Sequence, residues 1–163
     1  MTWTLQQATT PDHYRAAVEL FKEYAASLDF GLDFQNFDDE LEILPTMYGP
    51  PTGRLYLVAL EDTYVGCVGL RRIENEYTCE IKRMYLRPDH RGLGIGKALL
   101  TKTLEVARQM GYKTIKLDTI GYKMPSAVGL YQAMGFRETA PYNYNPYEGV
   151  LYFEKELEPG PQT

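Results

Sequence analysis

Hydrophobic residues along the chain repeat with two periods, one typical of strands and one typical of helices. Segments rich in strand-forming residues predict strands over 3–8, 54–61, 64–73, 77–87, 113–120 and 149–157. Segments with apolar residues every three or four positions predict helices over 11–28, about 38–44, 94–110 and 124–136. One further strand is expected before the last one. The predicted order is strand, two helices, three antiparallel strands, helix, strand, helix and two strands.

This order predicts an α/β protein. We expect a single domain with a mixed, mostly antiparallel central sheet of about seven strands, flanked by about four helices. The chain has 163 residues, enough for one compact domain with a hydrophobic core. No repeat, linker or second domain is evident. We therefore assign residues 1–158 to the domain and residues 159–163 to a flexible tail.

The strand predicted over 77–87 has an irregular pattern. Its apolar positions are odd-numbered at first and even-numbered later, namely Tyr77, Cys79 and Ile81, then Met84 and Leu86. Because side chains in a strand alternate between two faces, this phase change implies one extra residue. The sequence predicts a β-bulge near residues 82–83.

Composition adds few chemical constraints. The chain is 44% hydrophobic and 24% charged, which is ordinary for a soluble protein. Its two cysteines, Cys67 and Cys79, lie in apolar strands, so buried free thiols of a reducing cytosol are favoured over a disulfide. Two histidines and the cysteine spacing give no metal-binding pattern, so no metal is expected. Without a long apolar run or a signal-peptide core, we expect a soluble, cytoplasmic protein with no membrane partner.

Charge is distributed unevenly. The net charge of −5 argues against nucleic acid as a partner. Residues 82–102 nevertheless contain one acid and six basic residues, namely Lys82, Arg83, Arg87, Arg91, Lys97 and Lys102. Residues 23–53 contain seven acids and no lysine or arginine. A basic segment in an acidic protein indicates a small polyanionic ligand, unless these charges simply form solvated faces.

Three alternating glycines lie within RGLGIG, residues 91–96, between a predicted strand and a predicted helix. Such loops bring backbone amides close to phosphate groups. The dinucleotide-binding fingerprint does not fit, because Lys97 or Leu99 occupies the place of its third glycine. The P-loop does not fit either, because Arg91 and Ala98 replace its first glycine and its Ser or Thr. The remaining pattern is R-x-x-G-x-G; a tight turn without a ligand is the alternative.

With its surroundings, this pattern resembles the GNAT superfamily of acetyl-CoA-dependent N-acetyltransferases. Three blocks carry the resemblance: EIKRMYLRPDHRGLGIGKALL, YKTIKLDTIGYKMPSAVGLYQAMGF and LYFEKEL. They cover roughly residues 54–157, and their order and spacing match the family. The resemblance implies the acyl-CoA N-acyltransferase fold and acetyl-CoA as the co-substrate.

The resemblance also implies a cofactor site. The glycine loop and the following helix would hold the pyrophosphate of CoA, and exposed backbone of the preceding strand would pair with the pantetheine arm at a splay in the sheet. The implied cofactor-binding residues are Met84, Tyr85, Leu86, Arg91, Gly92, Leu93, Gly94, Ile95, Gly96 and Lys97.

Two catalytic residues follow from the resemblance. Tyr131 matches the family tyrosine that protonates the departing thiolate as a general acid, whereas the helical pattern alone favours a core aromatic residue. Met124 stands where many members have an asparagine that contacts the pantetheine. Glu80 is the first candidate for the general base, and a surface glutamate is the alternative. Asp118 is the second candidate, with a structural role in a turn as its alternative.

The acceptor is expected to be a primary amine, either a small molecule or a peptide or lysine amine. An acidic, aromatic loop over 30–48 falls where the superfamily builds its acceptor site. The residues expected to attract or surround a cationic amine are Asp33, Asp38, Asp39 and Glu40, with Phe34, Phe37 and Tyr48 beside them. The acids are equally explained as the first turn of a helix. A second aromatic loop, PYNYNPYEG at 141–149, is positioned to close the site or to form a homodimer surface.

Two other functions are open. A CoA-binding regulatory or sensor domain without catalysis would retain the glycine loop and make Tyr131 dispensable. A nucleotide-binding adaptor is disfavoured because both nucleotide motifs fail.

Overall fold

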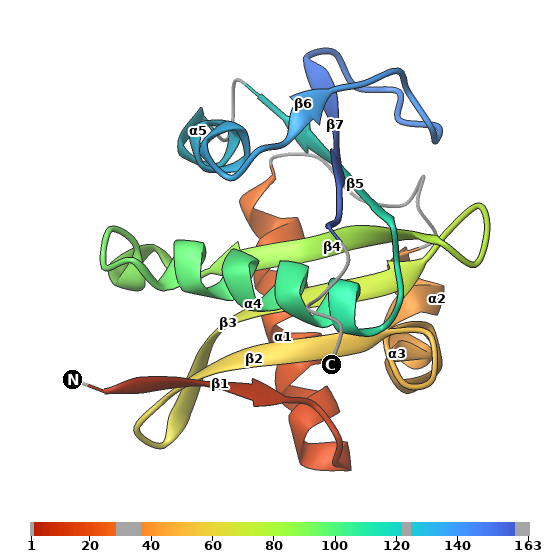
Figure 1. Cartoon of the computed structure of the whole chain (residues 1–163). Coiled ribbons are helices and arrows are strands. Elements are labelled where there is room, and N and C mark those ends of the chain that lie inside the picture. The colour runs from red at the N-terminus through yellow and green to blue at the C-terminus, as the bar shows by residue number, and fades with distance from the viewer. Residues whose placement is uncertain (1, 29–36, 122–124, 159–163) are drawn as a thin grey trace. The chain divides into compact units, whose positions relative to one another are not determined.

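A computed structural model describes residues 2–28, 37–121 and 125–158 of the chain (Figure 1). Its elements in chain order are β1 (Trp3–Gln7), α1 (Pro11–Ser27), α2 (Phe37–Glu42), α3 (Leu44–Met47), β2 (Arg54–Leu60), β3 (Thr63–Arg72), β4 (Thr78–Leu86), the 3₁₀-helix η2 (Pro88–His90), α4 (Ile95–Gln109), β5 (Thr114–Ile120), α5 (Pro125–Ala133), β6 (Arg137–Glu138) and β7 (Val150–Glu156). None of the described helices is long and apolar enough to cross a membrane.

The seven strands of the described residues form one sheet in the order β1-β2-β3-β4-β5-β7-β6. The pairs β1–β2, β2–β3, β5–β7 and β6–β7 are antiparallel, and β4–β5 is parallel. This mixed, mostly antiparallel sheet confirms the predicted fold class. By their contacts the residues group into two compact units, Met1–Arg71 with Ile81–Thr103 and Arg72–Glu80 with Leu104–Thr163.

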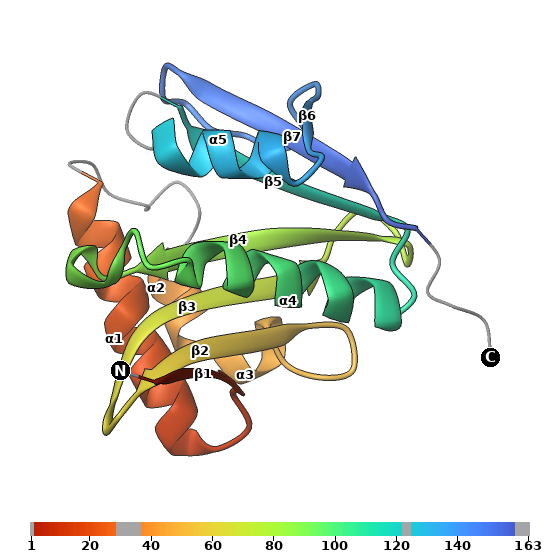
Figure 2. The same ribbon diagram turned by 60° about the vertical axis from the view of Figure 1, so that its left-hand side comes forward.

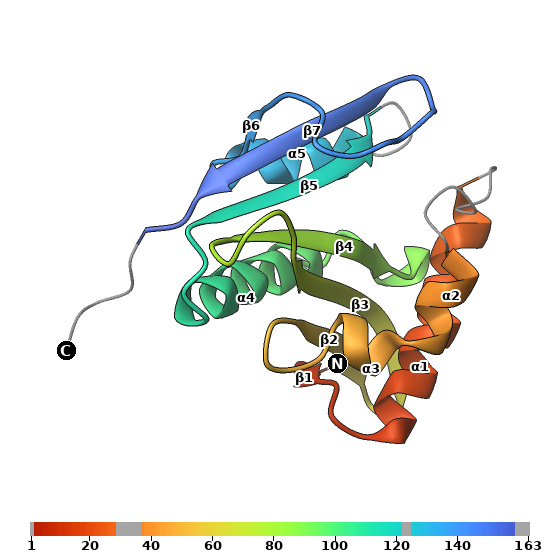
Figure 3. The same cartoon turned by 90° about the vertical axis from the view of Figure 1, so that its right-hand side faces the viewer.

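In the first unit, helices cover both faces of the sheet formed by β1, β2, β3 and the second part of β4. Helices α1, α2 and α3 lie against one face, and the first turns of α4 lie against the other (Figure 3). Packing is close: the ring of the buried Tyr48 lies against Gly69, where an added Cβ would come within 2.7 Å of it. Only glycine therefore fits at that point of β3, and the fit locks the segment 44–48 onto the sheet.

In the second unit, β5 and β7 pair along their whole length, from Thr114↔Glu156 to Ile120↔Val150. The start of β4 runs parallel to β5, and α5 lies beside β5 and β7 (Figure 2). The ring of Tyr131 from α5 packs 6.3 Å from the ring of Phe153 on β7, so an aromatic contact joins the helix to the sheet.

The predicted helix boundaries agree with the local chemistry. Thr10 caps α1 by accepting a hydrogen bond from the backbone N–H of His13 at 3.2 Å, and Pro11 is the first helical residue. Gly111 and Gly135 follow α4 and α5 with φ angles of 92° and 94°, as helix-ending glycines do.

The structure corrects one predicted helix and supports the irregularity predicted in β4. The single helix predicted over 38–44 is instead two, α2 and α3, which raises the number of α-helices in the described residues from about four to five. Pro45 explains the break, because it has no N–H to continue the hydrogen bonds of α2. In β4, Arg83 has a φ angle of 56°, a conformation that supports the irregularity predicted at residues 82–83. The proposed tail, 159–163, lies outside the described residues.

Candidate active site

The glycine loop joins η2 to α4 and has an open backbone. Gly92 and Gly94 both have φ angles of 82°, which residues with side chains rarely adopt. A Cβ atom added at either glycine would meet no other atom within 4 Å. The glycines are therefore required by backbone conformation rather than by crowding. The first amides of α4, which begins at Ile95, have no acceptor inside the helix and are available to an anion.

The loop is tied to the end of β4. The Nε atom of Arg91 donates to the carbonyl oxygen of Leu86 at 2.8 Å, and its guanidinium lies 5.9 Å from the ring centroid of Tyr85. Tyr85 is buried, and Met84 and Leu86 are partly exposed. The first unit thus brings together all the residues expected to bind the cofactor.

Only part of the basic segment contributes exposed charge. Lys82 and Arg83 are buried, so they are not available at the surface to attract a polyanion. Arg87 is ion-paired with Glu23, at 2.7 Å between Nη2 and Oε2. The exposed basic side chains next to the glycines are Arg91 and Lys97. The interpretation of the whole segment as a ligand-attracting surface is wrong for the buried members, because they lie inside the sheet.

The acidic, aromatic segment also differs from the expectation. Phe37, Glu40 and Tyr48 are buried, and Glu40 is bound to Arg83 by two hydrogen bonds of 2.9 Å. These three residues therefore do not line an exposed amine site. Asp38 and Asp39 are exposed in the first turn of α2, and their role in acceptor binding stays a prediction. Asp33 and Phe34 lie outside the described residues.

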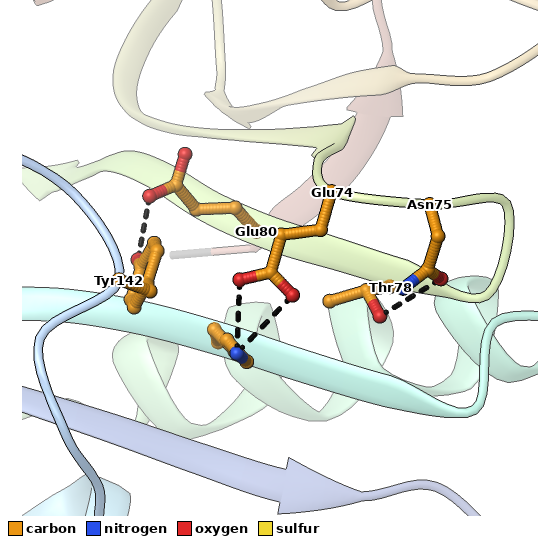
Figure 4. A network of polar contacts seen from close by, with 6 residues as sticks. Glu74, Asn75, Thr78, Glu80 and Tyr142 are labelled. Carbon is orange, nitrogen blue, oxygen red and sulfur yellow. Dashed lines mark hydrogen bonds and ion pairs between the residues drawn. The ribbon is translucent and has the colours of Figure 1, made fainter.

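Glu80 is buried in the second unit, with 1% of its surface exposed. The hydroxyl of Tyr142 donates to its Oε2 atom at 2.5 Å (Figure 4). The alternative interpretation of Glu80 as a surface glutamate is therefore wrong. Lys116 lies nearby, with Nζ 5.3 Å from the ring centroid of Tyr142 and 3.0 Å from Oε1 of Glu74. The hydroxyl of Tyr142 fixes the direction of the buried carboxylate, and the role of Glu80 as a general base stays a prediction.

The second aromatic loop is fixed at the same edge. The Nδ2 atom of Asn143 donates to Oδ2 of Asp118 at 3.0 Å, and the rings of Tyr142 and Tyr152 lie 5.5 Å apart. Burial raises the pKa of Tyr152, and the charge of Asp118 raises it further. Asp118 lies within β5 rather than in the turn expected for its structural alternative, and it holds the loop by this hydrogen bond. Its role as a general base stays a prediction. The sequence did not predict that Tyr142 contacts Glu80 or that Asn143 contacts Asp118. The two pairs are 62 and 25 positions apart, respectively, and no local pattern links residues at such separations.

Tyr131 is buried on α5, with its ring 5.8 Å from the ring of Phe136. Its ring has the packing of a core residue, and the role of its hydroxyl as a general acid stays a prediction. Tyr131 and Glu80 belong to the second unit, and the glycine loop belongs to the first.

Two further expectations concern Met124 and metal binding. Met124 lies outside the described residues. Within the described ranges, no cluster of three or more His, Cys, Asp or Glu could hold a metal.

Comparison with known proteins identifies the family. The family model "Acetyltransferase (GNAT) family" matches residues 11–136. An uncharacterized N-acetyltransferase of Schizosaccharomyces pombe is 39% identical over 140 residues, 85% of this chain and 85% of the relative.

Solved structures agree on the fold. A GNAT acetyltransferase of Staphylococcus aureus matches with a TM-score of 0.79 at 23% identity, over 96% of this chain and 100% of the other. A Salmonella typhimurium protein, whose structure contains its cofactor acetyl-CoA, matches with a TM-score of 0.68 at 19% identity, over 100% of this chain and 98% of the other. From the family model and the close relative together, this chain belongs to the GNAT family of acetyltransferases.

Proposed function

We propose that this protein is an N-acetyltransferase that moves the acetyl group of acetyl-CoA directly to a primary amine. The observation that carries the proposal is the glycine loop of a GNAT chain, with Gly92 and Gly94 at positive φ immediately before α4. The acetyl-CoA present in a solved protein of the same fold supports the choice of co-substrate.

The first unit would hold the CoA portion. The amides of residues 92–97 surround the pyrophosphate, and the helix dipole of α4 adds attraction for its negative charge. Arg91 and Lys97 supply exposed positive charge beside the amides. The backbone of Met84–Leu86 pairs with the pantetheine arm.

Two side chains of the second unit would move protons. The amine nitrogen attacks the thioester carbonyl carbon, so an N–C bond forms and the C–S bond breaks. Glu80 accepts the proton that the amine loses, directly or through a water molecule, while Tyr142 holds its carboxylate. Tyr131 donates a proton to the departing CoA thiolate. CoA leaves as the free thiol.

We propose a small amine or a peptide or lysine amine as the acceptor. The support is the aromatic loop over 141–149, which carries Tyr142 against Glu80 and presents Tyr144 to solvent. A homodimer through the aromatic loop over 141–149 is also proposed; sedimentation equilibrium of the purified chain measures its oligomeric state directly.

The decisive experiment combines acetyl-CoA, a panel of amines and a thiol-release assay. We expect release with at least one amine, and a fall in kcat of about 100-fold in Tyr131→Phe with unchanged acetyl-CoA affinity. Tyr77→Phe, at an exposed turn, is the matched control. Absence of release with every amine, despite acetyl-CoA binding, would favour the catalytically inactive CoA-binding domain.

A further inference from the structure

Two arginines bracket the backbone segment proposed to pair with pantetheine. Arg83 directly precedes Met84–Leu86, and Arg87 directly follows it. Each arginine makes a forked contact with a glutamate from a helix, Glu40 of α2 for Arg83 and Glu23 of α1 for Arg87. All these residues belong to the first unit. Two helices are thus joined to the two ends of one short stretch of β4.

The first contact is buried. Nε and Nη2 of Arg83 each lie 2.9 Å from a different carboxylate oxygen of Glu40, with only 3% and 2% of the side chains exposed. Tyr48 donates its hydroxyl to Glu40 at 3.1 Å, and the guanidinium carbon of Arg83 lies 5.3 Å from the ring centroid of Phe37. A buried ion pair seldom stabilises a fold more than apolar residues of similar volume would. What a forked pair does supply is a defined direction for both side chains.

The backbone at Arg83 needs such a constraint. Its φ angle of 56° is an unusual conformation for a residue with a long side chain, and it lies within a strand. The thiol of Cys67 donates to the carbonyl oxygen of Arg83 at 3.3 Å. Both the side chain and the carbonyl of Arg83 are therefore held. Because a positive φ redirects the strand, it determines how the peptide groups of Met84–Leu86 are presented.

The second contact holds the other end. Nη2 and Nε of Arg87 lie 2.7 and 3.0 Å from the two carboxylate oxygens of Glu23, and the two side chains are 36% and 37% exposed. The backbone N–H of Arg87 donates to the carbonyl oxygen of Val65 on β3 at 2.9 Å. Arg87 is therefore fixed by its main chain and by its side chain.

We propose that Glu40 and Glu23 are positioning residues for acetyl-CoA: through Arg83 and Arg87 they set the conformation of the Met84–Leu86 backbone. This inference rests on the proposed function, in which that backbone pairs with the pantetheine arm. It also gives Glu40 a role different from the recognition of the acceptor amine. The two carboxylates act on the cofactor without touching it.

The test compares Glu40→Gln and Glu23→Gln with Glu42→Gln, an exposed glutamate of the same helix as Glu40. Glutamine keeps the size of the side chain and removes the charge of the fork. We expect the KM and Kd for acetyl-CoA to rise about 10- to 100-fold in the first two variants, with kcat of the folded fraction little changed. Glu42→Gln should behave as the wild type does.

Arg87→Lys and Arg83→Lys complete the test, since lysine keeps the charge without the fork. We expect both to raise the KM for acetyl-CoA. If Glu40→Gln does not fold, the KM and Kd values of Glu23→Gln and Arg87→Lys, which change the partly exposed pair, decide the outcome. Folded variants with wild-type KM and Kd would overturn the inference. Failure of the wild-type protein to bind acetyl-CoA would instead overturn the proposed function, so the two failures are distinguishable by calorimetry on the wild type alone.

Discussion

At the scale of single residues, the two thiols show how burial controls chemistry in this protein. Cys67 and Cys79 are both buried and are not joined to each other. Each donates to a backbone carbonyl, Cys67 to Arg83 at 3.3 Å and Cys79 to Thr114 at 3.7 Å. Burial raises the pKa of both thiols well above the ordinary value of 9.0, and the charges of Glu23 and Glu80 respectively add to the rise. Both thiols are therefore protonated and unreactive near neutral pH.

These pKa shifts predict a loss of stability in alkali. Because the folded pKa lies above the unfolded value, the unfolded chain loses these protons first as the pH rises above about 9. The stabilisation that the thiols contribute is fully present below that pH. Above it, each thiol lowers the unfolding free energy by about 1.4 kcal/mol for every further pH unit. Between about pH 8 and 10.5, the unfolding free energy measured with urea should fall more steeply with pH for the wild type than for the double variant Cys67→Ala/Cys79→Ala. Equal slopes would contradict the assignment.

Glu80 and Tyr142 show a second residue-scale effect. A glutamate on a strand next to lysines and arginines is typical of a protein surface, yet Glu80 is 1% exposed. The burial of its charge is compensated by the hydroxyl of Tyr142 at 2.5 Å (Figure 4). The side chain is thus a buried hydrogen-bond acceptor within its own unit rather than a solvated group.

At the scale of elements, glycines end the helices and shape the loops of this fold. Gly111, after α4, has a φ of 92°, whereas Gly129 lies within α5 and has no unusual φ. A Cβ atom added at either residue would have no other atom within 4 Å. The two positions therefore differ in backbone conformation and not in available space.

The same substitution should consequently have opposite effects at these two glycines. We expect Gly129→Ala to stabilise the protein by about 0.5–1 kcal/mol, because alanine loses less backbone entropy in a helix. Gly111→Ala should destabilise it by about 1–2 kcal/mol, because the left-handed conformation is unfavourable for a residue with a Cβ. The midpoints of urea unfolding measure both effects. A loss of stability in Gly129→Ala would show that space or contacts matter there after all.

At the scale of the whole molecule, net charge says little about the proposed ligand. The chain carries −5, yet CoA is itself an anion. Exposed charges separated by more than about 8 Å are largely screened at physiological salt. We therefore expect the few groups beside the loop, namely the helix amides, Arg91 and Lys97, to decide binding of the proposed ligand, and the acids elsewhere to have little influence on it.

Binding of acetyl-CoA should stabilise the folded protein. At a free concentration of about 100 times Kd, the unfolding free energy rises by about 2.7 kcal/mol. For a chain of this size the Tm should then rise by about 5–10 °C in a thermal-shift assay. CoA should compete with acetyl-CoA, and ATP should not. An equal shift with ATP would favour a nucleotide-binding adaptor over an acetyltransferase.

Local chemistry determined much of this protein from the sequence alone. The periodicity of apolar residues predicted most of the strands and helices and their succession along the chain, because each buried element repeats its contact face within a few residues. Thr10, Gly111 and Gly135 marked helix ends for the same local reason. The glycine loop and its surrounding blocks also indicated the family, which the comparisons confirm.

The tertiary structure decided which charges meet. Nothing in the sequence distinguishes Glu40, which is buried against Arg83, from the exposed Asp38 and Asp39 beside it. The partners of Glu80 and Asp118 were equally inaccessible, because Tyr142 and Asn143 come from a loop far along the chain. Whether a charge is solvated or buried depends on the chain segments that fold over it, and those contacts have no local pattern. The sequence thus determined most of the elements and the loop, and the fold decided which charges form ion pairs.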